Sequence, residues 1–597
     1  MIGNAIDEIG NLNPQMWREI KGRLKPRNIV ISVAISLLTQ FLLVQYFLTQ
    51  LPSEPISGKF RSPIYNTYCT GKRTYEYSSN VVCIRDSFGN FIINWELWNR
   101  DVFVCLSFVA IFSLLVIGTY LLINDLSQEE RRGTLNFIRL SPQSNLSILI
   151  GKIFGVPILL YLAIVLAIPL HLWTGISGIG NFEDYSDQDF NFGLYPLGQI
   201  GCFYCVVIAC CILFYSAALL YSLVSNWLGG FQPWLGTGVV LGFLWLNYLL
   251  TYSPLNTPLS WLRLLTPFDL IPDVLHSSFY RYNYQYLSKS LSLNLQWYNL
   301  PIGEIGFFRK TRAFLRLFSL LNFALWNCWI WQALNRSFRN PNKTILSKGQ
   351  SYLLTACFQI SLIGFTVPGY TSNYLSAKDW LFQHFMFLCA LNFLLFLVLI
   401  AILSPHRQVL HDWARYRHQN QGKSLIKDLI FGEKSPALVA IAINLGIAIT
   451  AISLWSLSSA AEFKYKAATL VSLAFAFTLV MLYAVLTQIL LFVRIKNNII
   501  WAIGALSASI FLPLIGLAVF QVNPDKSLGF LWYFSVLAPL ATYWEETPVV
   551  QIFVSALAQW TVIGLLTVQL TRKLQLAGES ATKALLQERK ALPARNL

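Results

Sequence analysis

Residues 29–46 read IVISVAISLLTQFLLVQY, a block without a charged side chain. A transmembrane helix needs about 20 mostly apolar residues to cross a hydrocarbon core of roughly 30 Å. The block follows a basic stretch and lacks a small-residue cleavage site. We therefore expect a retained membrane helix rather than a cleaved signal peptide.

Similar apolar blocks recur along the whole chain of 597 residues. Hydrophobic residues make up 55% of it and charged residues only 12%, whereas soluble domains carry roughly 25% charged residues. This composition predicts an all-α integral membrane protein with about 12 transmembrane helices. The expected spans are 28–50, 102–123, 152–172, 197–225, 234–252, 313–333, 350–370, 381–403, 437–457, 467–493, 498–521 and 549–571.

The net charge of +16 is distributed unevenly between the loops. With the N-terminus inside, the basic excess falls on the cytoplasmic side, as the positive-inside bias of membrane proteins predicts. We therefore expect a multi-pass protein of the plasma (inner) membrane that has both termini in the cytoplasm. Its partners would include membrane lipids but no nucleic acid.

The order of the apolar blocks suggests an internal duplication into two six-helix halves. The first half, 1–345, would contain an N-terminal interfacial helix, an outer loop at 51–101 and an inner loop at 124–151. The second half, 346–597, would contain an inner loop at 404–436 and a cytoplasmic tail. Each large inner loop follows the second span of its half.

The stretch 13–25, NPQMWREIKGRLK, has helical periodicity. Trp17, Ile20 and Leu24 share one face, and basic side chains lie towards the other. This pattern is typical of a helix that lies in the headgroup plane. An ordinary basic flank before the first span is the alternative interpretation.

Two of the ten cysteines, Cys69 and Cys83, fall in the polar outer loop. An oxidising compartment would favour a disulfide between them, although the free thiols remain an alternative. The other eight lie in expected helices, where cysteine is usually an inert small hydrophobe.

The first inner loop reads DLSQEERRGTLNFIRLSP at 125–142. We expect a short charged helix with an apolar edge made by Leu135, Phe137 and Ile138. Such dense charge suits a cytoplasmic protein partner better than lipid. Gly133 allows a sharp bend or a close backbone approach.

The motif Glu130-x-Arg132-Gly133-Thr134-Leu135, followed by Leu140-Ser141-Pro142 and Gly151-Lys152, resembles the permease subunits of type-two ABC exporters. The basic helix at Asn13-Pro14, the large outer loop and Leu265-Thr266-Pro267-Phe268 after the fifth span are also similar to this family. The resemblance covers about residues 13–340.

In that family the motif forms the coupling helix, which docks into a groove of a cytoplasmic ATPase. The resemblance therefore implies a permease of an ATP-driven ABC transporter, an exporter, that works with two separate ABC ATPase subunits. The residues that it implies in the ATPase contact are Glu129, Glu130, Arg131, Arg132, Gly133, Thr134 and Leu135.

The second half lacks the Arg-Gly-Thr-Leu motif in its inner loop. The loop keeps a charged and aromatic character around Trp413, Arg415 and Arg417. Two interpretations stay open: a second ATPase contact through these three residues, or a solvated basic loop that follows the positive-inside bias.

We expect no catalytic residues, cofactor or metal site in this chain. A phosphate-binding loop requires Gly-x4-Gly-Lys-Ser/Thr between a strand and a helix. Gly422-Lys423-Ser424 has Arg417 where the first glycine should stand. The chain is therefore not expected to be an enzyme, and an ATPase must be a separate polypeptide.

The expected spans contain almost no Asp, Glu, Lys or Arg. Ion-coupled transporters usually carry such residues near the midplane, so energy supplied from outside the bilayer is favoured. Two other functions stay open. One is a non-transporting membrane scaffold or assembly factor; the other, less favoured, is an ion-coupled secondary transporter.

Overall fold

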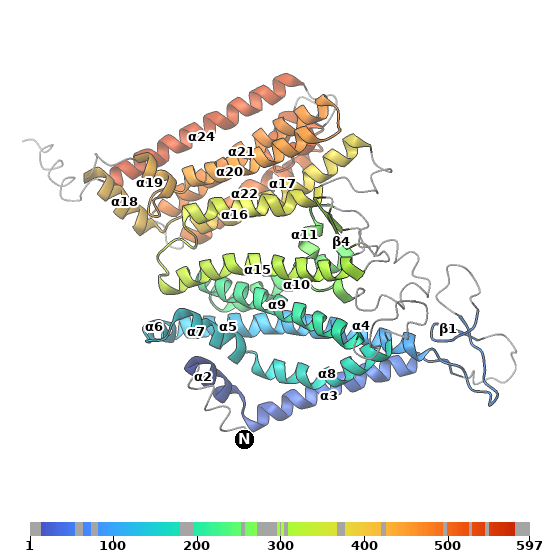
Figure 1. Cartoon of the computed structure of the whole chain (residues 1–597). Helices are drawn as coiled ribbons and strands as arrows, with labels where there is room; N and C mark the ends of the chain where they lie inside the picture. Colours follow the sequence, from blue (N-terminus) through green and yellow to red (C-terminus); the bar gives the residue numbers. More distant parts are fainter. Residues whose placement is uncertain are drawn as a thin grey trace, which may run out of the picture. The chain divides into compact units, whose positions relative to one another are not determined.

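The computed structural model is almost entirely helical in the residues that it describes (Figure 1). Those residues are 13–53, 64–72, 81–178, 195–251, 257–271, 295–298, 300–303, 309–366, 376–419, 425–493, 498–524, 528–543 and 548–578. Gly422-Lys423-Ser424 lies outside them.

The chain divides into two compact units, Met1–Arg339 and Asn340–Leu597. This division and the boundary that we expected after residue 345 both fall in the loop between helices α15 (Arg309–Arg339) and α16 (Lys348–Ile363). The duplication of six helices in each half stays a prediction.

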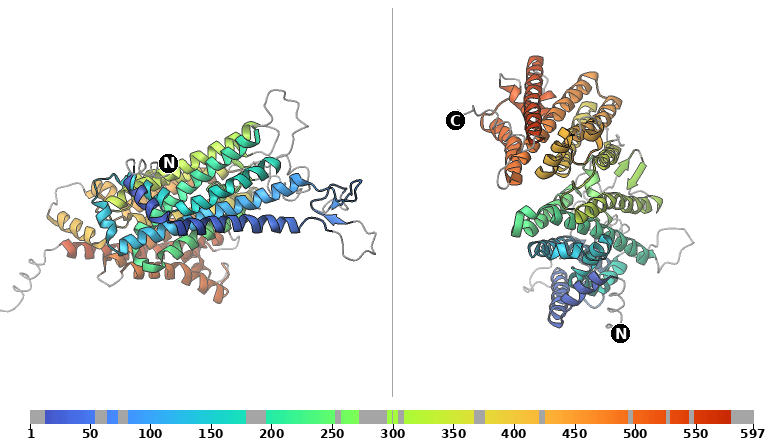
Figure 2. Two further views of the ribbon diagram at one scale, coloured as in Figure 1. Left: turned by 90° about the horizontal axis from the view of Figure 1, so that it is seen from below. Right: turned by 90° about the vertical axis from the view of Figure 1, so that its left-hand side faces the viewer.

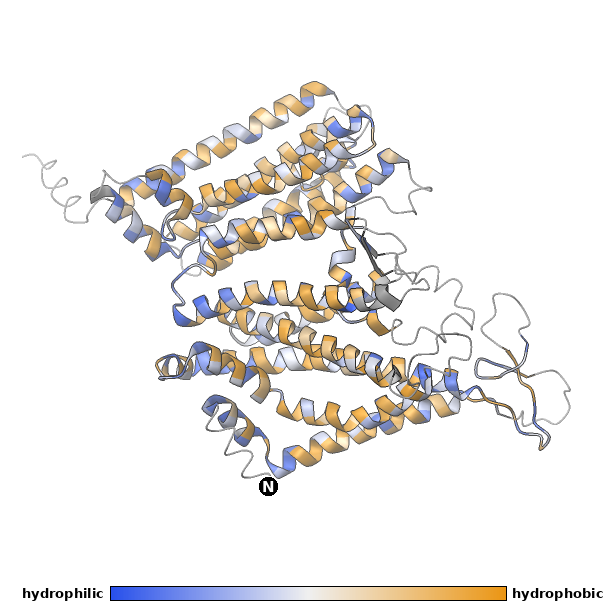
Figure 3. Cartoon of the chain, in the orientation of Figure 1, coloured by the Kyte–Doolittle hydropathy of each residue, from blue (hydrophilic) through white to orange (hydrophobic). Residues whose placement is uncertain are grey.

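Ten helices of the described residues are long and apolar enough to cross a membrane. Figure 3 shows the apolar residues along their length. The prediction of an all-α, multi-pass membrane protein is therefore confirmed. The ten segments are Pro26–Thr49, Trp95–Arg131, Ile158–Gly178, Leu197–Val224, Asn226–Leu250, Ala377–Leu403, Leu438–Ser458, Phe463–Phe492, Asn498–Val519 and Val549–Gly578.

Two of the expected spans, 313–333 and 350–370, have no counterpart among these ten segments. They fall on α15, which carries basic residues at both ends, and on α16, which has only 16 residues. The count of twelve thus rests on the sequence pattern.

In the first unit the long helices run side by side (Figure 2). Both α3 and α4 pack on α8, α5 packs on α9 and α10, and α15 packs on α9. Their bounds are α2 Pro14–Arg23, α3 Pro26–Thr49, α4 Trp95–Phe112, α5 Gly118–Arg131, α6 Thr134–Arg139, α7 Asn145–Gly155, α8 Ile158–Gly178, α9 Tyr195–Val224, η2 Asn226–Phe231, α10 Gln232–Thr251 and α11 Ser260–Arg263.

A π-helical turn, η1 (Ser113–Ile117), joins α4 to α5 into one continuous segment. The wider turn frees a backbone carbonyl, and the Tyr215 hydroxyl donates to Leu114 O at 2.8 Å. Gly118 permits this approach, because a Cβ there would lie 2.3 Å from the Tyr215 hydroxyl oxygen.

The third span begins later than we expected from the sequence. We placed Lys152 at its start, but Lys152 belongs to the separate helix α7, and α8 begins only at Ile158. Pro157 explains the interruption, because proline lacks the N–H that a continuous helix would need. The apolar character of α7 hid this break in the sequence.

The described parts of the outer loop form a small cross-linked structure. Strand β1 (Tyr65–Asn66) pairs antiparallel with β2 (Val81–Val82), and a disulfide joins Cys69 to Cys83.

Beyond the fifth span, Arg263 of α11 makes a buried two-pronged ion pair with Asp269, with N–O distances of 3.1 and 2.8 Å. A short hairpin of β3 (Leu295–Trp297) and β4 (Leu300–Gly303) precedes α15.

In the second unit the long helices also pack on one another. Helix α16 packs on α20, α21 packs on α20, α22 and α24, and α18 packs on α24. The bounds are η3 Gly364–Thr366, α17 Ala377–Leu403, α18 Arg407–Gln419, α19 Leu425–Phe431, α20 Leu438–Ser458, α21 Phe463–Phe492, α22 Asn498–Val519, η5 Gly529–Phe534, α23 Ala538–Thr542 and α24 Val549–Gly578.

Candidate partner-docking site

The first inner loop turns back sharply at Gly133. Helix α5 ends at Arg131, and Gly133 adopts φ +74° before α6 begins at Thr134. Only glycine adopts this left-handed conformation without appreciable strain. The Thr134 hydroxyl donates to Glu129 O at 3.1 Å and holds the turn closed.

The apolar edge that we expected on this helix is divided between two directions. Leu135 and Ile138 are 1% and 6% exposed and pack inward, whereas Phe137 is 81% and Leu140 85% exposed. We call Phe137 and Leu140, with the exposed Leu146 of α7, the apolar tip. Large exposed apolar side chains flanked by polar residues are typical of protein-binding surfaces.

The seven residues expected to contact an ATPase do not all reach the surface. Glu130 accepts a hydrogen bond from the Asn226 side chain, Glu129 pairs with Lys152, and Leu135 is buried. The exposed members are Arg131, Arg132, Gly133 and Thr134. These four lie next to the apolar tip in the chain, and the two arginines supply its basic rim.

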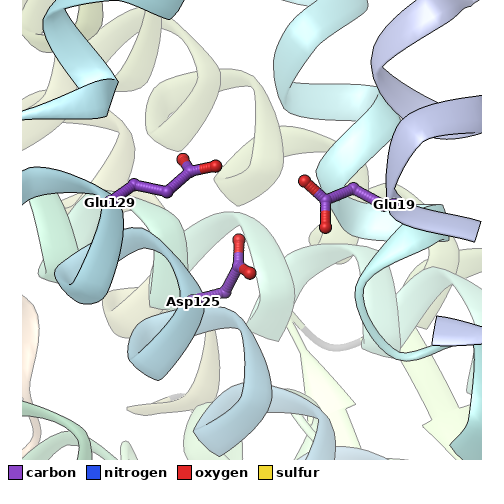
Figure 4. A group of neighbouring side chains, drawn as sticks. All are labelled: Glu19, Asp125 and Glu129. Atoms are coloured by element: carbon purple, nitrogen blue, oxygen red, sulfur yellow. The ribbon is translucent and has the colours of Figure 1, made fainter. Parts of the chain in front are cut away.

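Lys152 is completely buried and is surrounded by carboxylates. Its ammonium nitrogen lies 2.7 Å from Asp125, 2.7 Å from Glu129 and 3.7 Å from Glu19. Figure 4 shows how these three carboxylates converge from α2 and α5. Lys152 enters the same space from α7, so one buried cation holds three helices together.

Two arginines of α2 complete this group. Arg18 lies 2.7 Å from Glu129, and Arg23 bonds both Asp125 and Glu19. Three cations thus face three carboxylates, which leaves no net charge. We call the six residues the ion-pair cluster: Arg18, Glu19, Arg23, Asp125, Glu129 and Lys152.

The three carboxylates have oxygens within 4.8 Å of one another, a spacing that could hold a metal ion. The Lys152 ammonium group already lies against two of them at 2.7 Å. The geometry therefore serves an internal ion-pair network rather than a metal site.

The cluster shifts the pKa of its own cations. Burial of Lys152 opposes its charge, but Asp125, Glu129 and Glu19 outweigh that cost and raise the pKa of Lys152 above the ordinary 10.5. Partial burial also opposes the charge of Arg18, and its two glutamate partners again raise the pKa. Both side chains therefore stay charged at physiological pH.

Close backbone packing places α2 against α7. The Asn13 side chain accepts from Met16 N at the start of α2 and donates to Ser147 O of α7 at 2.8 Å. A Cβ at Gly151 would lie 2.8 Å from Met16 N. The contact therefore requires glycine at 151.

Only part of the ion-pair cluster could be predicted from the sequence. The resemblance singled out Gly151-Lys152, but nothing local linked Lys152 to Glu19 or Asp125, which lie 133 and 27 positions away. The spacing of Asp125 and Glu129, four residues apart in a helix, was the one available signal that both face the same way. For α2, we expected Ile20 on a lipid face, whereas it is buried inside the unit.

In the second inner loop, the structure does not bring the three expected residues together. Trp413 and Arg417 are four positions apart on one side of α18 and are partly buried, whereas Arg415 points to the other side and is exposed. Arg417 pairs with Asp428 of α19 at 3.6 Å. These residues therefore form no surface comparable to the apolar tip.

No family model, no curated protein and no solved structure matches this chain.

Proposed function

We propose that this chain is the membrane-spanning permease of an ATP-driven ABC transporter, an exporter, and that separate ATPase subunits drive it. The observation that carries the proposal is the apolar tip with its basic rim, at the position of the Arg-Gly-Thr-Leu motif. Phe137 and Leu140 would fill an apolar groove of the ATPase, and Arg131 and Arg132 would meet acidic groups at its edge.

The connection between the apolar tip and helix α5 suits the transmission of force. The tip is attached to α5 through the short turn at Gly133, and α4, η1 and α5 form one continuous 37-residue segment. Such a segment is about 55 Å long at roughly 1.5 Å per residue. Because the ion-pair cluster fastens α5 to α2 and α7, movement of the tip would carry all three helices.

The proposal includes a topology of twelve spans, with α15 as the sixth and α16 within the seventh. Both termini and the apolar tip would then lie on the cytoplasmic side of the plasma membrane, where ATP is available. ATP-driven closure of the ATPase subunits would move the inner loops, and the helix sets would alternate access to a central path.

Co-purification tests this proposal. The tagged chain, extracted in mild detergent, is expected to retain a nucleotide-binding protein. Arg132→Glu, Gly133→Trp and Phe137→Asp should each reduce its amount at least tenfold, because they change the charge, the turn or the apolar contact of the tip. Phe88→Asp, at an exposed apolar residue of the outer loop, is the matched control and should not.

Retention of the same ATPase by all three tip variants would refute the assignment. Solute uptake by the purified chain alone, driven by an ion gradient in vesicles, would also refute it and would support a secondary transporter. Tolerance of the tip variants together with loss of another membrane complex would support a scaffold.

A further inference from the structure

Helix α19 of the second unit exposes an apolar surface of its own. Leu425 is 44%, Ile426 71% and Phe431 60% exposed, and no residue of α19 is buried. By its place in the chain it corresponds to the coupling segment of the first unit. Its contacts with neighbouring helices differ from those of that coupling segment.

Helix α19 is fastened to the first two turns of α16. The buried Lys348 donates to Leu429 O at 2.8 Å and to Pro436 O at 2.9 Å, and the Tyr352 hydroxyl donates to Ile430 O at 2.7 Å. The bonds to Leu429 O and Ile430 O satisfy carbonyls at the C-terminus of α19, where a cation is also favourable. They fasten α19 against the N-terminal end of α16.

The next span also starts close to α19. Residues 432–437 alone separate Phe431 from α20, and the side chain of Ser435 lies 2.6 Å from the Lys348 ammonium nitrogen. In the first unit, the 11-residue helix α7, about 16 Å long, stands between α6 and the span α8. The apolar tip can therefore project from the membrane, whereas α19 lies at the depth where the second unit's helices begin.

The exposed charges around α19 are cationic. Lys427 and Lys434 are exposed, Glu433 is half-buried, and Asp428 faces Arg417 at 3.6 Å. Apolar side chains beside long cationic ones are the pattern of a helix in the headgroup region, because lysine can extend its ammonium group to lipid phosphates.

We propose that α19 is a membrane-surface helix that binds anionic phospholipid. Leu425, Ile426 and Phe431 enter the boundary between acyl chains and headgroups, and Lys427 and Lys434 bind the phosphates. The second inner loop is then a lipid anchor rather than a second ATPase contact. The inference needs only the membrane assignment, so it can hold even if the proposed ATPase coupling fails.

Site-specific photocrosslinking tests the position of α19. The full chain carries p-benzoylphenylalanine in place of Ile426, or in place of Phe137 as the matched exposed control, in vesicles of phosphatidylcholine and phosphatidylglycerol without an ATPase. After irradiation, mass spectrometry is expected to find phospholipid adducts at 426 and at least tenfold fewer at 137. Equal yields at the two positions, or absence of a lipid adduct at 426, would overturn the proposal.

Two further measurements separate the lipid from other occupants. Lys427→Gln and Lys434→Gln should each lower the ratio of phosphatidylglycerol to phosphatidylcholine adducts about fivefold, whereas Lys25→Gln should not. A ratio that follows bulk composition in the unchanged chain would rule out the anionic preference. A nucleotide-binding protein crosslinked to 426 in cell membranes would show that α19 is a docking site after all.

Discussion

Replacing Lys152 by methionine removes the one cation that all three carboxylates of the ion-pair cluster share. The side chain is fully buried, so methionine keeps most of its volume but leaves three carboxylates facing two arginines. Removing one partner of a buried ion pair typically costs roughly 3–5 kcal/mol, because it leaves buried charge that nothing compensates. We expect a loss of that size.

Thermal unfolding in detergent micelles measures the change, with Lys25→Met as the exposed control that should unfold like the unchanged protein. The double variant Lys152→Met with Glu129→Gln restores two cations facing two carboxylates, and it should recover more than half of the lost stability.

Two results would refute this account. One is a Lys152→Met protein as stable as the Lys25→Met control. The other is a double variant that is less stable than the single one, because the charge balance would then not be what Lys152 contributes.

Three further outcomes are expected from thermal unfolding. Gly151→Ala should destabilise the first unit by roughly 1–3 kcal/mol, because its Cβ would lie 2.8 Å from a backbone nitrogen of α2, whereas Gly22→Ala, with open space around it, should not; equal effects would contradict the close packing. Arg263→Met should cost roughly 3–5 kcal/mol by leaving the buried Asp269 unpaired, and a neutral result would show that this pair is dispensable. Burial lowers the pKa of Lys348 to about 8 although Asp428 opposes the shift. Its contribution to stability is therefore complete above the ordinary lysine pKa and is lost as the pH falls through 8. Lys348→Met loses the hydrogen bonds that this ammonium group donates, but its stability relative to the unchanged protein should be higher at pH 7 than at pH 10.

The membrane class and the approximate positions of ten spans could be predicted from the sequence, because hydrophobic length is a local property that each block of about 20 residues carries alone. The turn at Gly133 could be expected for the same reason, since its need for a left-handed backbone is set at one residue. The apolar interval around Pro157 misled us, because hydropathy does not register a helix break between two apolar helices.

Contacts between distant segments were decided only by the tertiary structure. Lys152 meets Glu19 and Asp125 because α2 folds back onto α7, and no periodicity within α2, α5 or α7 encodes that pairing. The same holds for the inward direction of Leu135 and for the bonds from Lys348 that bring α19 to the end of α16. Ion pairs and side-chain packing depend on distances through space, and a pattern along the chain specifies those distances only within a single helix.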